Sequence, residues 1–74
     1  MEYTLPRPGF VELKVFDMLG QEVRALVNDF QQAGFKSVVW DGKNNQAQPV
    51  PSGVYIYRIV ADGFTQSSKS LLLK

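Results

Sequence analysis

Five acidic side chains near predicted turns are the first candidates for chemistry in this sequence: Asp17, Glu22, Asp29, Asp41 and Asp62. A pair of carboxylates could serve a glycosidase. An aspartate that opens a turn or precedes a glycine more often bonds to the nearby backbone through its side chain. The sequence has no histidine and no cysteine, which removes the commonest general base, the commonest metal ligand and any disulfide. We therefore predict that the protein is not an enzyme and that it has no catalytic and no metal-binding residue.

A calcium site is an alternative in the polar stretch after residue 40. Asp41, Asn44 and Asn45 supply oxygen atoms of the kind that calcium prefers. One carboxylate is too few for a typical site, and the alternating acids of an EF-hand loop are absent. We therefore expect no cofactor here.

Three aromatic residues offer a second binding alternative. Trp40, Tyr55 and Tyr57 could stack on a sugar if their rings faced solvent. Their alternating spacing favours a place in the core instead. Binding to an insoluble polysaccharide would support the sugar-binding alternative, and we expect none.

Length and charge limit the remaining function classes. The 74 residues suffice for one small domain, residues 1–74, with little room for a deep cleft. A net charge of +1 does not suggest a nucleic-acid partner. No apolar run approaches the roughly 20 residues of a membrane helix.

The elements that would position these residues are strands. Val11, Leu13 and Val15 alternate with charged residues, which predicts a strand over residues 10–16 with one buried face. Asp17 and Gly20 predict a tight turn into a second arm over residues 22–27. Val23 should point inward there, but two adjacent apolar residues break the alternation, so we expect a bulge or an early end. A helix over residues 22–30 is the competing interpretation.

The second half of the chain repeats this pattern. Residues 35–40 predict a strand with Val38 and Trp40 on one face, and Trp40 as the core anchor. A long polar loop then leads to a strand over residues 54–61, a hairpin turn at Asp62 and Gly63, and a last strand over residues 64–73. With a short strand at residues 3–5, the count is six or seven. Such a count without helices predicts two packed sheets or a barrel, and we favour the all-β, antiparallel β-sandwich.

A family resemblance rests on motifs spread along the chain. They are Tyr3-Thr4-Leu5-Pro6, Val11-x-Leu13-x-Val15-Phe16-Asp17-x-x-Gly20, Val23-x-x-Leu26, Gly34, Trp40-Asp41-Gly42, Ser52-Gly53-Val54-Tyr55-x-Tyr57 and Lys69-x-x-Leu72-x-Lys74. In this order they resemble the type A C-terminal sorting domain of the type IX secretion system (the Por secretion tail). They also resemble the related immunoglobulin-like domain of the flagellar hook-capping protein.

The resemblance implies an immunoglobulin-like sandwich without catalytic activity. It implies a domain that sorts and anchors a covalently linked upstream cargo, is recognised by the outer-membrane secretion machinery, and is commonly removed by a sortase-like peptidase. The product would be secreted or held at the cell surface after crossing the periplasm, with a signal peptide expected upstream. The segment expected to be recognised is Lys69, Ser70, Leu71, Leu72, Leu73 and Lys74. Structural roles are expected for Asp17, Gly20, Gly34, Trp40, Asp41, Gly42, Ser52, Gly53, Tyr55 and Tyr57.

Two departures from the family pattern lead to further expectations. In the family a full strand precedes the Tyr-x-Leu-Pro motif, so we expect that strand to be clipped or supplied by another domain. The family also tends to have glycine where Ala47 stands. Because an alanine forced to positive φ costs about 1 kcal/mol, we expect a different turn in this loop.

Two further interpretations stay open at this point. The same sandwich could be a structural spacer or interaction module of a multidomain extracellular enzyme or of a flagellar hook cap. An exposed edge strand could also pair weakly with another copy of the chain, because its unpaired backbone groups are a template for strand addition.

Overall fold

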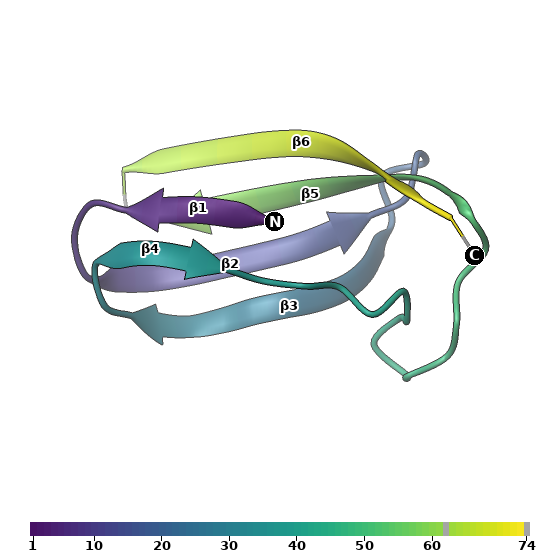
Figure 1. Cartoon of the computed structure of the whole chain (residues 1–74), viewed down its shortest axis with the longest axis horizontal. Coiled ribbons are helices and arrows are strands. Elements are labelled where there is room, and N and C mark those ends of the chain that lie inside the picture. Colours follow the sequence, from purple (N-terminus) through teal and green to yellow (C-terminus); the bar gives the residue numbers. More distant parts are fainter. Residues whose placement is uncertain (62, 74) are drawn as a thin grey trace.

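The computed structural model describes residues 1–61 and 63–73, and within them it contains strands and no helix (Figure 1). The strands are β1 (Glu2–Leu5), β2 (Gly9–Phe16), β3 (Glu22–Gln31), β4 (Gly34–Ser37), β5 (Gly53–Ala61) and β6 (Phe64–Leu72). One antiparallel sheet has the order β3-β2-β5-β6, and β1 pairs with β4 in a second sheet. The two-stranded sheet lies across the larger one in Figure 1. The predicted all-β sandwich of six or seven strands is confirmed, with six.

The core lies beneath the two-stranded sheet and centres on β2. Val11, Leu13 and Val15 are fully buried, and they alternate with Glu12 and Lys14 on the other face, as the sequence predicts. Burying each such side chain stabilises the fold by about 1.5–3 kcal/mol. The buried cluster consists of Tyr3, Leu5, Val11, Leu13, Ile59 and Ala61.

The turn between β2 and β3 forms where the sequence predicts it. The Oδ1 atom of Asp17 accepts hydrogen bonds from the backbone N–H groups of Leu19, at 2.9 Å, and Gln21, at 3.0 Å. Gly20 has a φ of 83°, which only glycine adopts without strain. The structural roles predicted for Asp17 and Gly20 are therefore those the structure gives them.

The segment after this turn is a strand, so the helical alternative is wrong. β3 continues to Gln31, and its pairing with β2 shifts twice, leaving Val23 and Leu26 without a partner in the ladder. Each shift is a β-bulge, in which one strand has an extra residue. The expected bulge is confirmed, and the expected early end is not.

The strand predicted over residues 35–40 is shorter than expected. β4 ends at Ser37, because its partner β1 begins at Glu2, and the last bonds between the two segments are the two that join Met1 and Val38. Trp40 therefore lies in the loop that follows. It is half-buried and outside the buried cluster, so its prediction as core anchor is wrong.

The second half of the larger sheet follows the sequence closely. β5 pairs with β6 from Gly53 opposite Leu72 to Ala61 opposite Phe64 without a shift. Tyr55 is buried, as its spacing predicts, Ile59 is buried too, and Tyr57 is half-buried. The predicted hairpin turn includes Asp62, which lies outside the described residues.

Candidate functional site

Residues 69–72 of the segment that the sequence singled out for recognition lie on β6, at one edge of the larger sheet. β6 is bonded to β5 and forms the end of the strand order. Leu71 and Leu73 keep 60% and 77% of their surface exposed. Lys69 is exposed too, while Ser70 and Leu72 are half-buried. Lys74 lies outside the described residues.

The alternation along β6 sorts these side chains between the two faces of the sheet. Lys69 and Leu71 pair with Ile56 and Val54, and so lie on the outer face, away from the core. Ser70 pairs with the buried Tyr55, and therefore lies on the inner face. The outer face of this end combines one cation with exposed aliphatic side chains. That combination suits recognition of a surface better than chemistry.

The loop that carries Asp41 is contacted by an arginine of β3. The Nη1 atom of Arg24 lies 3.5 Å from Oδ1 of Asp41. The same atom lies 3.4 Å from the carbonyl oxygen of Lys43 and 3.3 Å from that of Asn44. The guanidinium thus links β3 to three oxygen atoms of this loop. Among residues 1–61 and 63–73, no group of three His, Cys, Asp or Glu side chains could hold a metal ion.

Asn45 fastens the same loop to β3. Its side-chain oxygen accepts from the Ala25 N–H at 2.9 Å, and its Nδ2 donates to Glu22 at 3.0 Å. Its backbone N–H donates to the carbonyl of Val23, the residue at one bulge. The loop therefore covers this end of the β3 edge.

Ala47 adopts the conformation that we expected this loop to avoid. Its φ is 64°, in the left-handed region, and its N–H donates to the Asn44 carbonyl at 3.0 Å. The side-chain oxygen of Asn44 accepts from the backbone N–H groups of Gln46 and Gln48, both at 3.0 Å. The expectation of a different turn is wrong, because this network holds the backbone in place against the cost of the conformation.

The aromatic residues near the loop pack on one another. The ring of Trp40 lies 5.0 Å from that of Tyr55 and 6.3 Å from that of Tyr57, both edge to face. The Trp40 indole N–H donates to the Lys43 carbonyl, and the Tyr55 hydroxyl donates to the Pro51 carbonyl at 2.7 Å. This arrangement joins the loop to β5. It does not present the flat, exposed platform that a sugar site requires.

The remaining motif residues have backbone roles. Gly34 opens β4 with a φ of 136°, and Gly42 is buried with a φ of 76°. Ser52 directly precedes β5. Gly53 has no positive φ, and a Cβ atom built on it would meet nothing within 4 Å. Neither the backbone conformation at residue 53 nor the space around it therefore requires a glycine.

Among the described residues, three of the candidate carboxylates are engaged by a turn, an arginine or a lysine. Asp17 accepts hydrogen bonds from the backbone of its turn, and Asp41 forms an ion pair with Arg24. Glu22 lies 3.1 Å from the Lys14 ammonium, and the hydrogen bond from Lys14 is the main cause that lowers the pKa of Glu22 below its ordinary value. The hydrogen bond from Asn45 lowers it further. Asp62 lies outside the described residues.

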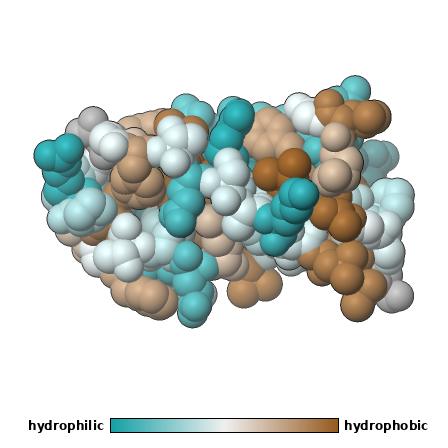
Figure 2. All heavy atoms as spheres, turned by 90° about the horizontal axis from the view of Figure 1, so that it is seen from above, coloured by the Kyte–Doolittle hydropathy of each residue, from teal (hydrophilic) through white to brown (hydrophobic). Residues whose placement is uncertain are grey.

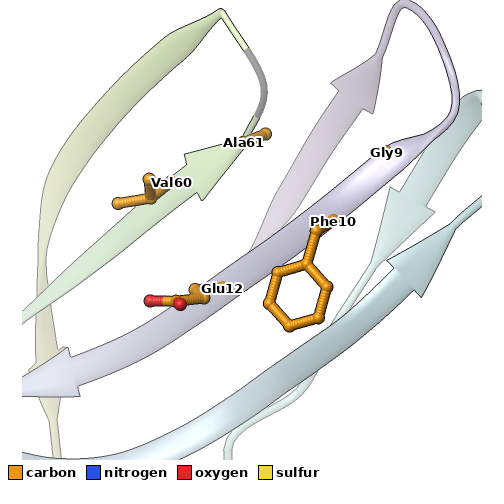
Figure 3. A pocket seen from close by; sticks show the side chains of 5 residues that line it. All are labelled: Gly9, Phe10, Glu12, Val60 and Ala61. Atoms are coloured by element: carbon orange, nitrogen blue, oxygen red, sulfur yellow. The ribbon is translucent and has the colours of Figure 1, made fainter.

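An open hollow lies on the outer face of the larger sheet, with a volume of about 420 Å³ (Figure 3). Phe10 and Glu12 project into view from β2 and Val60 from β5. Glu12, the one charged residue of its lining, lies 3.8 Å from the Lys14 ammonium. Binding sites usually converge several polar groups on a ligand, and this hollow does not.

Comparison with known protein families shows one of the two candidate relationships. Residues 1–64 match the model of the FlgD Ig-like domain. The chain belongs to the FlgD Ig-like domain family. No curated protein and no solved structure matches the chain.

Membership in the FlgD Ig-like family gives the sandwich its class. The domain is an immunoglobulin-like module of a non-catalytic kind. The match takes in β1 to β5 and ends at the first residue of β6. Residues 69–74 therefore lie beyond the matched region, and the family gives no information about them.

Sequence reasoning missed one residue that shapes this region. Arg24 was not considered, because its partners lie on a loop far along the chain and neither segment carries a local signal for the other.

Within the described residues, no helix is long and apolar enough to cross a membrane.

Proposed function

We propose that this FlgD Ig-like domain is a sorting and anchoring domain, which directs a covalently linked upstream cargo through the outer membrane by type IX secretion. The observation that carries the proposal is the position of the last strand: β6 is an edge strand, its Lys69 and Leu71 are exposed, and Leu73 directly after it is exposed too. A translocon component could therefore reach both the side chains and the free backbone groups of this strand.

The proposed partners follow from that role. The outer-membrane machinery would bind residues 69–74, and a sortase-like peptidase would cut upstream of the domain. The cargo would pass through the periplasm and reach the medium or the cell surface. The motifs in the sequence support this proposal, and the absence of a gathered catalytic or metal-binding cluster among the described residues is consistent with it.

The test uses a fluorescent reporter with a signal peptide, fused ahead of this domain in a bacterium that has type IX secretion. We expect the reporter on the surface or in the medium of a strain with a working translocon, and in the periplasm of a strain without one. Periplasmic retention in both strains would refute the proposal.

Point variants locate the recognition without removing part of a strand. Lys69→Glu and Leu71→Ser change exposed side chains on the outer face of β6, so we expect folded domains that are exported poorly. Asn28→Lys, at an exposed position of β3 on the opposite edge, is the matched control and should leave export unchanged. Equal export of all three variants would place recognition elsewhere and contradict the role of residues 69–74.

A structural spacer or interaction module is the second candidate function. The family match favours it, because residues 1–64 contain nearly all of the buried core and stop before the exposed part of β6. Under this proposal the reporter fusion is exported from neither strain, while the domain still folds and stabilises a neighbouring domain to which it is joined. An unchanged melting temperature of the neighbour, with and without the module, would contradict it.

A further inference from the structure

β6 differs from the other exposed strand edges of the molecule. β1 and β4 have four residues each, and such short edges offer little to a partner strand. β3 is interrupted by two bulges, and the loop that contains Asn45 bonds to its backbone. β6 runs for nine residues in unbroken register with β5. In Figure 1 it forms the upper edge of the molecule, with no other element beyond it.

The composition of β6 also leaves this edge weakly protected. Its sequence, FTQSSKSLL, contains one charged residue, Lys69, and no proline. Charges and prolines are the usual means by which an edge strand is kept from pairing. Figure 2 views the molecule from this side and shows pale and teal side chains over its middle, with hydrophobic ones gathered at the right-hand end.

We infer that β6 pairs antiparallel with β6 of a second copy of this chain, about a two-fold axis at Ser68, so that two four-stranded sheets become one of eight strands. This inference does not depend on the proposed export function. The inferred partner is a second copy of the chain, because in one register the side chains of β6 are complementary to those of another β6.

The choice of register follows from the alternation of side chains and from Lys69. Residues that pair across antiparallel strands share a face, so a symmetric pair must have one residue on its axis. Ser68 is the midpoint of β6 (Phe64–Leu72), and an axis there lets all nine residues pair. An axis at Lys69 would place two ammonium groups opposite each other, which is unfavourable. An axis at Ser67 would shorten the pairing.

The Ser68 register also brings apolar side chains together at each end of the pair and opposes no like charges. Phe64 meets Leu72 of the other copy at each end, on the inner face, and both residues are half-buried in the single chain. Lys69 meets Ser67, and so faces no like charge. Cross-strand apolar pairs of this kind stabilise a sheet. The two ends of β6 thus supply the apolar contacts, and its polar middle supplies backbone hydrogen bonds.

Sedimentation equilibrium over a range of concentrations is the first measurement. We expect the mass of the full chain to rise from one copy toward two as its concentration increases. A constant mass of one copy up to millimolar concentration would overturn the inference, and would leave the β6 edge to a different partner. Ser67→Lys places a lysine opposite Lys69 twice in each dimer and should weaken association by between about twofold and thirtyfold.

A crosslinking pair of variants tests the register directly, because the chain contains no cysteine. Facing residues in an antiparallel pair have Cα atoms about 4.5–5.5 Å apart, within the range of a disulfide. Ser68→Cys should therefore give a disulfide-linked dimer under mild oxidation. Gln66→Cys lies on the same face of the same strand, but its copy would be about 13 Å away along the strand, so it should remain reduced.

The outcomes of this comparison are distinct. Crosslinking of Ser68→Cys alone supports the inferred register. Equal crosslinking of both variants, or crosslinking of Gln66→Cys alone, would overturn it. Circular dichroism of each variant before oxidation establishes that the sandwich is intact, and Gln32→Cys, at an exposed position outside the strands, gives the background rate of random collision.

Discussion

Replacing Ala47 with glycine should stabilise the domain. Ala47 has a φ of 64°, while the bonds around it come from the backbone and from Asn44. The alanine methyl group is exposed and belongs to no buried cluster. Ala47→Gly therefore removes backbone strain, keeps every hydrogen bond of the loop and removes no core contact.

The expected gain is the difference between two effects. An L-residue in the left-handed region costs about 1–2 kcal/mol relative to its preferred conformation. Glycine has more freedom than alanine in the unfolded chain, and this costs about 0.4–1 kcal/mol on folding. The free energy of unfolding should therefore rise by about 0.8 kcal/mol at the middle of these ranges and by at most about 1.6 kcal/mol; a gain of about 0.8 kcal/mol in a domain of this size corresponds to roughly 3–6 °C in melting temperature.

Thermal melting followed by circular dichroism measures this difference, and urea titration gives the free energy of unfolding independently. Ala33→Gly is the matched control, because Ala33 is also an exposed loop alanine but its φ is not positive. Only the unfolded-state effect operates there, so the control should lose about 0.4–1 kcal/mol. The two glycine variants should thus move in opposite directions.

Equal destabilisation of the domain by Ala47→Gly and Ala33→Gly would refute this account of the loop. That result would mean that Ala47 is not held in the left-handed region in solution. A gain well above 2 kcal/mol would also contradict it, since the conformational penalty is not large enough to supply such a gain.

Three other predictions concern the core, the surface charges and the aromatic loop. Leu13→Ala opens a cavity beneath the two-stranded sheet and should lower the free energy of unfolding by about 2–5 kcal/mol in urea titration; a loss below 1 kcal/mol would mean that the core is loosely packed. Because the folded pKa of Glu22 is lowered, the stability it contributes is present above its ordinary pKa of 4.5 and is lost as pH falls through the folded value. Glu22→Gln should therefore remove up to about 1 kcal/mol at pH 7 and leave a flatter pH profile below pH 5; identical profiles would exclude the ion pair with Lys14. Trp40→Phe keeps a ring but loses the bond to the Lys43 carbonyl, so it should cost about 0.5–1.5 kcal/mol in the same titration, and no change would show that the bond contributes nothing.

The sequence predicted best those elements whose pattern is set by their own burial. β2 alternates because one of its faces is in the core, and Val11, Leu13 and Val15 show this directly. The length of β4 was not predictable in this way. β4 ends where β1 no longer provides a partner, and residues 38–40 contain no local signal that predicts this end.

The same distinction, between what a local pattern predicts and what depends on distant partners, applies to the candidate site. The exposure of Lys69 and Leu71 follows from the alternation of β6, but the position of β6 at an edge depends on the strand order of the sheet. That order is a property of the whole fold. The contacts of Arg24 were missed for the same reason. The positive φ of Ala47 was missed because alanine prefers a negative φ, and the hydrogen bonds around Asn44 that overcome this preference form only in the folded loop.

The strand order also determines how this chain can reach its folded state. The β2–β3 and β5–β6 hairpins join neighbours in sequence, and each can form within microseconds. The central pairing of β2 with β5, however, brings Val11 opposite Ala61, and β1 must find β4 across the first hairpin. Such distant pairings require the chain to close large loops, and the entropy lost in closing them is offset only after the strands make contact. We expect folding in milliseconds to seconds, because the two hairpins form first and the pairing of β2 with β5 is the slower step.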